Sequence, residues 1–255
     1  MSFEAISKLD GQVAVITGGK GAIGLATARR LAALGARIVS IDRSEPEKVQ
    51  ALLDSLPAVS SGPHFALTAS ITDSAALNLA AQAVKQHAGR CDILINSAGF
   101  TKPVAANDLE GLTDELFDEV VQTNLRGVFA TIRAFTPLLK ANSDGLIVNV
   151  SSIAGFTGAG SNLAYAAAKA GVDVLTKALA KTLAPHVRVL AVSPGVVDSS
   201  FVPGRGTDFN EKAAATIPLK RIGHVDDTAS AIEACATTLR FATGSRFVVD
   251  GGRSL

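Results

Sequence analysis

The stretch Val13-Ala14-Val15-Ile16-Thr17-Gly18-Gly19-Lys20-Gly21-Ala22-Ile23-Gly24 decides the fold class of this chain. The apolar run 13–16 is short and β-branched, which is typical of a strand buried on both faces of a parallel sheet. It enters a glycine-rich turn, and an Ala/Leu-rich helix pattern follows over 22–35, closed by Gly35. A turn without Cβ atoms lets the backbone approach a pyrophosphate, which the free N–H groups of the helix N-terminus attract. An ordinary tight turn would also explain such glycines if they stood alone.

Outward from this turn, short apolar runs alternate with helix patterns to the end of the chain. The pattern predicts further strands at 37–41, 64–68, 93–95, 146–150, 187–192 and 246–249. It predicts further helices near 45–55, 73–87, 113–139, 162–184 and 225–240, with a looser segment at 194–223. Repeated β-α-β order with right-handed crossovers gives an α/β fold. We therefore expect a single doubly wound Rossmann-type domain over 1–255, with a seven-stranded parallel sheet and helices on both faces.

Composition excludes several classes of protein. Of 255 residues, 24 are Lys or Arg and 23 are Asp or Glu, so the net charge of +1 argues against a nucleic-acid partner. No apolar run approaches the ~20 residues of a membrane helix, and no secretory signal is visible, so we expect no membrane partner. The isolated Cys91 and Cys235 and four scattered histidines predict no metal site and a cytoplasmic, reducing location.

The second predicted strand ends in an acidic residue, Asp42, which lies 18 residues beyond Gly24. A carboxylate at about 20 residues from the glycine turn accepts hydrogen bonds from the adenosine ribose of a dinucleotide. It also repels the 2′-phosphate of NADP. Arg43 and Lys20 are cations that could instead attract this phosphate. We predict NAD as the cofactor, with NADP possible.

A second group of residues carries proton-transfer chemistry. The chain's one tyrosine, Tyr165, precedes Lys169 by four residues, which places both side chains on one helix face. Ser152 follows the fifth predicted strand, at the edge where open α/β sheets bind ligands. A phenol exchanges a proton near neutral pH only if a cation such as Lys169 stabilises the phenolate, and Ser152 can hydrogen-bond the substrate oxygen. Taken alone, the pair could equally be an amphipathic tyrosine beside a solvated lysine.

Together these motifs resemble the short-chain dehydrogenase/reductase family over essentially the whole chain. The turn resembles its TGxxxGxG pattern, with Ala22 at the second glycine, and Asn96-Ser97-Ala98-Gly99 resembles its NNAG. The segments 217–223 and 249–252 are also typical of the family, whereas Ser70 replaces its frequent adenine-side aspartate. The resemblance implies a catalytic tetrad of Asn124, Ser152, Tyr165 and Lys169. It implies cofactor contacts from Gly18, Lys20, Gly21, Ile23, Gly24, Asp42, Arg43, Ser70, Ile71, Asn96, Ala98, Gly99, Tyr165, Lys169, Pro194, Gly195, Val197 and Ser199.

The resemblance also implies an oxidoreductase that moves a hydride between a nicotinamide cofactor and a secondary alcohol or ketone. Polyols, sugars, 3-oxoacyl thioesters and steroids all stay open as substrates, because the charges of segment 196–216 are mixed. We expect this segment to act as a substrate lid, with Phe100, Phe156 and Phe201 as pocket walls. A non-catalytic redox-sensing or scaffolding module of the same fold is the alternative, although it would be expected to lose Tyr165 or Lys169. A further alternative is an enzyme of the same fold that catalyses epimerisation or dehydration.

The predicted helix at 113–139 carries more apolar residues than one sheet contact would cover. A second buried face against another subunit would explain this excess, and the family resemblance implies a homotetramer built through this helix and the next. The alternative is a helix buried entirely within its own monomer.

Overall fold

The computed structural model describes residues 8–204, 206 and 208–255. Within them, seven parallel strands form one sheet in the order β3-β2-β1-β4-β5-β6-β7. The chain fills one half of the sheet first and then returns to place β4 beside β1, which leaves a crevice at the carboxyl ends of these two strands. The strands are β1 (Val13–Thr17), β2 (Arg37–Asp42), β3 (Phe65–Thr68), β4 (Ile93–Asn96), β5 (Gly145–Val150), β6 (Val187–Pro194) and β7 (Arg246–Val249).

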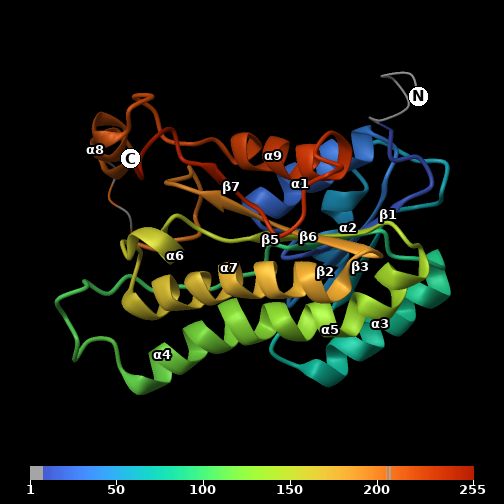
Figure 1. Ribbon diagram of the computed structural model, residues 1–255, viewed down its shortest axis with the longest axis horizontal. Helices are drawn as coiled ribbons and strands as arrows, with labels where there is room; N and C mark the ends of the chain where they lie inside the picture. The colour runs from blue at the N-terminus through green and yellow to red at the C-terminus, as the bar shows by residue number, and fades with distance from the viewer. Residues whose placement is uncertain (1–7, 205, 207) are drawn as a thin grey trace.

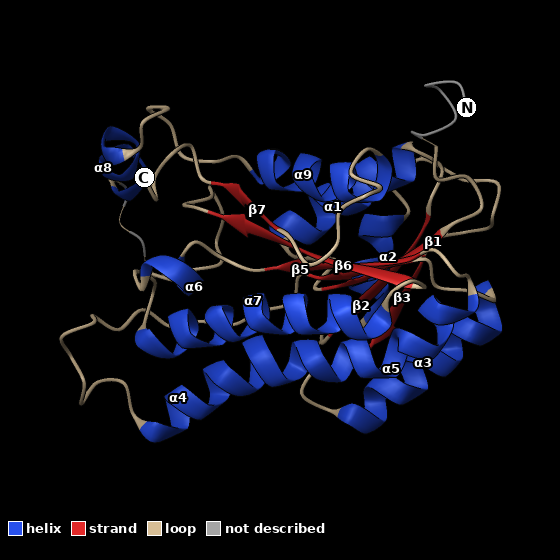
Figure 2. Ribbon diagram, in the orientation of Figure 1, coloured by secondary structure: helices blue, strands red, loops and turns tan. Residues whose placement is uncertain are grey.

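Helices cover both faces of the sheet (Figure 1). One face carries α1 (Ala22–Ala33), α2 (Pro46–Leu53) and α9 (Val225–Thr237). The other carries α3 (Ser74–Ala88), α4 (Asp114–Val121), α5 (Gly127–Ala141) and α7 (Leu163–Leu183). Two short helices, α6 (Ala154–Thr157) and α8 (Phe209–Thr216), lie together with the C-terminus beyond one end of the sheet (Figure 2). The predicted α/β architecture is confirmed.

The central strands are buried along their whole length, as their unbroken apolar sequences predict. Every residue of β1, β4 and β5 is buried, and each face of the sheet has its own apolar cluster beneath its helices. Side-chain caps set where several helices begin. The Asp73 carboxylate accepts the N–H groups of Ala75 and Ala76 at the start of α3, and the Thr113 hydroxyl accepts that of Leu116 in α4.

The structure differs from the sequence prediction in three segments. The helix predicted over 113–139 contains a π-helical turn, η2 (Gln122–Arg126), between α4 and α5. The helix α6 follows β5 where no helix was predicted, and α8 lies inside the segment 194–223 that was expected to be irregular. With four and eight residues, α6 and α8 are too short to show a helical period in sequence.

Large apolar side chains remain exposed on the layer of α4, α5 and α7. Phe117 is 40% exposed, Phe129 is 39% exposed and Val174 is 66% exposed. On the other face, the Arg30 guanidinium of α1 binds the Asp226 and Glu233 carboxylates of α9. None of the helices in the described part of the chain has the length and apolarity to cross a membrane.

Candidate active site

The glycine turn after β1 is built so tightly that side chains are excluded from it. Gly18 has φ of +68°, and a Cβ there would lie 2.8 Å from the Ala98 Cα atom. A Cβ on Gly24 would collide with the Gly18 carbonyl oxygen. Gly21 caps α1 without a side-chain hydrogen bond, so the first N–H groups of the helix stay available at the sheet edge. Ala22 is exposed, so its methyl group fits where the family pattern has glycine.

Asp42, at the end of β2, is fixed beside this turn. Its Oδ2 atom accepts the backbone N–H of Lys20 at 3.1 Å and the Ser40 hydroxyl at 2.8 Å. The Lys20 ammonium turns away and donates to the Ser44 hydroxyl at 3.0 Å. Arg43 is exposed. The carboxylate is therefore held in place, whereas the neighbouring arginine side chain is in solvent.

Ser152, Tyr165 and Lys169 are brought together at the carboxyl edge of the sheet. The Ser152 hydroxyl lies close enough to the Tyr165 phenol to lower the pKa of Tyr165. The Lys169 Nζ atom lies 5.6 Å from the centroid of the Tyr165 ring and donates to the Val150 carbonyl at 2.7 Å. Lys169 is 4% exposed, so its ammonium lies inside the protein below the ring.

Burial favours the neutral forms of Tyr165 and Lys169 by shifting the pKa of each side chain. Desolvation raises the pKa of Tyr165 to about 12, against the lowering effect of the Ser152 hydrogen bond. Desolvation lowers the pKa of Lys169 to about 8, although the Asp173 carboxylate one turn later raises it. At neutral pH the Tyr165 phenol therefore keeps its proton, and Lys169 is charged in most of the molecules.

Asn124 lies in η2, and its side-chain hydrogen bonds go to backbone groups and not to the other three residues of the predicted tetrad. Its amide nitrogen donates to the Phe100 carbonyl at 2.6 Å and the Val120 carbonyl at 2.9 Å, and its oxygen accepts the Phe100 N–H at 3.3 Å. It is fully buried. The side chain thereby fixes the loop that follows β4. A π-turn is a common way of re-aiming a functional side chain inside a helix.

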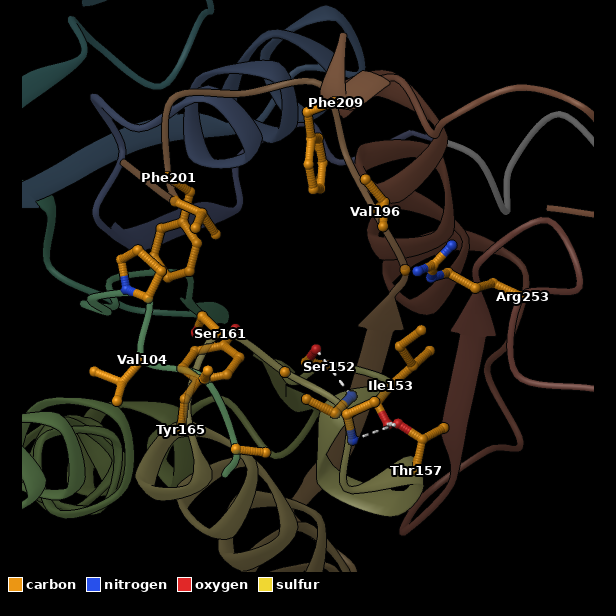
Figure 3. Close-up of a pocket in the computed structure, with 18 of the residues that line it drawn as sticks. Val104, Ser152, Ile153, Thr157, Ser161, Tyr165, Val196, Phe201, Phe209 and Arg253 are labelled. Carbon is orange, nitrogen blue, oxygen red and sulfur yellow. Dashed lines mark hydrogen bonds between the residues drawn. The ribbon is translucent and has the colours of Figure 1, made fainter. Parts of the chain in front are cut away.

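Ser152 and Tyr165 line two cavities. Figure 3 shows the larger one. The larger has a volume of about 930 Å³ and opens between the loop after β4, α6 and the segment after β6. The smaller has a volume of about 190 Å³ and extends from Tyr165 and Lys169 to the start of α1. Gly195 and Phe201 also line both. The two hydroxyls therefore lie where the two cavities share their lining.

The smaller cavity collects half of the predicted cofactor residues. Those that line it are Gly21, Ile23, Gly99, Tyr165, Lys169, Pro194, Gly195, Val197 and Ser199. Those outside its lining are Gly18, Lys20, Gly24, Asp42, Arg43, Ser70, Ile71, Asn96 and Ala98. Among the latter, Ser70 lies beyond β3, where its hydroxyl bonds that of Thr72 at 2.8 Å. The Asn96 side chain is buried and donates to the Asn149 side chain at 2.8 Å.

Several site residues were missed by sequence reasoning. Asn162 caps α7 by accepting the Tyr165 N–H at 2.7 Å, and it donates to the Lys102 carbonyl at 2.7 Å. A cap residue before the Tyr-x-x-x-Lys helix was the available signal. The loop residue Val104 and the C-terminal Arg253 line the larger cavity, and no local motif marks either one.

The predicted lid segment lines the larger cavity, but only one of the three predicted wall phenylalanines does so. Of the three phenylalanines, Phe201 lines the larger cavity, whereas Phe100 and Phe156 are not in its lining. Phe156 instead lies under the Arg246 guanidinium, 4.0 Å from its ring centroid. Segment 196–216 contributes a large part of the wall, and positions 205 and 207 within it lie outside the described residues. In the described chain no group of His, Cys, Asp or Glu is arranged to hold a metal.

Comparisons with known proteins agree with this geometry. A family model described as short chain dehydrogenase matches residues 12–208. The chain is 34% identical to granaticin polyketide synthase putative ketoacyl reductase 2 of Streptomyces violaceoruber, over 95% of this chain and 96% of that protein. It is 31% identical to the 3-oxoacyl-[acyl-carrier-protein] reductase FabG of Escherichia coli, over 95% of this chain and 97% of that protein. The solved structure of levodione reductase superposes with a TM-score of 0.89 at 29% identity, covering 97% of this chain and 99% of that one.

Proposed function

Because the chain belongs to the short-chain dehydrogenase/reductase family, whose members are NAD(P)-dependent oxidoreductases of carbonyl and alcohol groups, we propose that it reduces a small ketone with Tyr165 as proton donor. The observation that carries the proposal is the position of the Ser152–Tyr165 pair, which lines both cavities. A ketone in the larger cavity would place its oxygen at these hydroxyls, and its carbonyl carbon would face the smaller cavity.

The residues of the smaller cavity and of the glycine turn beside it fit a nicotinamide dinucleotide. The glycine turn leaves no room for a Cβ at Gly18, the start of α1 offers uncapped N–H groups, and Lys169 supplies a buried cation. When bound there, the cofactor would supply the hydride for the carbonyl carbon. We propose NAD as the preferred form, because Asp42 is fixed where a 2′-phosphate would add a second negative charge, while Arg43 is exposed.

Each residue has a part in the proton transfer. Tyr165 donates its phenolic proton to the ketone oxygen, and its raised pKa keeps that proton in place near neutral pH. Ser152 donates a hydrogen bond to the same oxygen, which accumulates negative charge as the carbonyl is reduced. The Lys169 ammonium then stabilises the phenolate that remains, and Asn124 holds the loop beside the site.

Replacing Tyr165 with phenylalanine tests the proposal. The change removes the transferable proton and little volume, so turnover of a ketone panel should fall about 10²- to 10⁴-fold. Binding of NADH, followed by its fluorescence, should persist. If Tyr165→Phe kept more than about a tenth of the wild-type rate, another group would be the proton donor. Net loss of NADH absorbance with ketones also separates reduction from epimerisation or dehydration, which leave the cofactor unchanged overall.

We also propose a cytoplasmic homotetramer. Phe117, Phe129 and Val174 give the α4–α5–α7 layer an exposed apolar surface that a partner subunit would cover. Cys91 and Cys235 are both buried and unpaired, which suits a reducing compartment. Size-exclusion chromatography with light scattering at micromolar concentration should give four times the chain mass, and a monomer would contradict the assembly.

A further inference from the structure

The larger cavity is lined by both apolar and polar groups. Most of the lining residues are apolar or glycine, and the hydroxyls of Ser152, Thr157, Ser161, Tyr165 and Thr216 also face it. Within the described part of the chain, Arg253 is the one charged residue in the lining. Figure 3 shows its side chain across the cavity from Tyr165. A ketone held at Tyr165 would therefore point its far end toward a cation.

Arg253 is held in this position by a defined turn after β7. Gly251 and Gly252 adopt φ values of +65° and +86°, which turn the chain back toward α8. The Asp250 carboxylate accepts the N–H groups of Gly252 and Ser254, both at 2.8 Å. The Arg253 Nη1 atom then donates to the Thr216 hydroxyl at 2.8 Å, while that hydroxyl donates to the Ala213 carbonyl at 2.8 Å.

The guanidinium retains most of its capacity to bind an anion. It has five N–H donors, of which the Thr216 contact uses one. No carboxylate of the described residues forms an ion pair with Arg253. Three acidic groups of the surrounding segments have other partners: Asp250 accepts backbone N–H groups, Asp208 pairs with Lys212, and Asp198 accepts the Asn210 amide.

We propose that the physiological substrate is a ketone bearing a carboxylate at the end remote from the carbonyl, and that Arg253 is the specificity-determining residue that binds this carboxylate. The inference rests on the proposed reduction of a ketone at Tyr165. A planar guanidinium forms paired hydrogen bonds with a carboxylate. Among the described residues the lining carries one positive charge, which matches a monoanion, and its alanine, valine, proline and phenylalanine side chains match an aliphatic or aromatic spacer.

The test uses methyl ketones of increasing chain length that end in a carboxylate, together with their neutral primary amides and the corresponding phosphates. At each chain length, kcat/KM is measured for the acid, the amide and the phosphate with the wild type, Arg253→Met and Arg253→Lys. Arg29→Met serves as the matched control, since Arg29 is an exposed arginine of α1 that lines neither cavity. The readout is the ratio of kcat/KM for the acid to that for its amide.

At the best chain length, the wild type and Arg29→Met should prefer the acid about tenfold or more, mainly through KM, and salt should weaken the preference. Arg253→Met should abolish it, and Arg253→Lys should retain part of it. Equal use of acid and amide by the wild type, an unchanged ratio in Arg253→Met, or a preference for the phosphate would overturn the inference alone. Failure to reduce any ketone, charged or neutral, would overturn the proposed function as well.

Discussion

Lys169 makes the stability of the ligand-free protein depend on pH in a direction opposite to that of the buried Tyr165 phenol, whose pKa is raised. Folding lowers the pKa of this ammonium from 10.5 to about 8, because the side chain is taken out of water. Between these two values the unfolded chain binds a proton that the native state has released. The free energy of unfolding contributed by Lys169 therefore rises with pH over this window. The full gain is on the order of 3 kcal/mol, of which about 1 kcal/mol falls between pH 7 and pH 9.

Urea denaturation of the wild type and Lys169→Met at both pH values measures this contribution. Other titrations, including the buried thiols, occur in both proteins and cancel in the difference. Lys169→Met should gain stability relative to the wild type at pH 7, and this advantage should shrink by about 1 kcal/mol at pH 9. Lys177→Met, an exposed lysine of the same helix, should track the wild type at both values. The assignment of a desolvated, titrating ammonium would be refuted if the free energies of unfolding of the wild type and Lys169→Met differed by the same amount at both pH values.

Three further substitutions test the cofactor turn and the site's supports. Asp42→Ala should narrow or reverse the preference for NAD over NADP in kcat/KM, and a wild-type preference for NADP would contradict the role given to Asp42. Gly24→Ala should weaken NADH binding at least about tenfold, because its methyl group meets the Gly18 carbonyl; unchanged fluorescence titrations would contradict this. Asn162→Ala should lower the unfolding free energy by about 1–2 kcal/mol in urea, whereas Asn162→Ser, which keeps a cap, should lose less than half of that.

The sequence predicts the sheet well because each strand is a short apolar run between turns and helices. Predicted strand limits such as 13–16 and 146–150 lie within one residue of β1 and β5, and α7 begins one residue after the predicted start. The π-turn at Gln122–Arg126 was not predictable in the same way. A single extra residue in a helix shifts the apolar period only slightly, so the sequence reads as one continuous helix.

The site was predictable where a motif joins neighbouring residues and not where tertiary packing joins distant ones. Tyr165 and Lys169 share a helix face, so their proximity follows from their spacing. Arg253 reaches the larger cavity only because two glycines turn the chain back after β7. Arg253 contacts Thr216, which is 37 positions away in the sequence, and no local motif predicts this contact. The charges of segment 196–216 therefore give no indication of the Arg253 cation.

Two asparagines connect the wall of the larger cavity to the helix end that carries Tyr165. From η2, Asn124 binds the Phe100 backbone at both its N–H and its carbonyl. From the start of α7, the Asn162 amide donates to the Thr101 hydroxyl and to the Lys102 carbonyl. The Val104 N–H completes the attachment by donating to the Ser161 carbonyl at 2.8 Å. The loop that walls the larger cavity is thus fastened to the same helix end that orients Tyr165. Because buried amides without partners are costly, the wall and the phenol are expected to keep one relative position while different substrates are accommodated on the opposite side, by the segment after β6 and by Arg253.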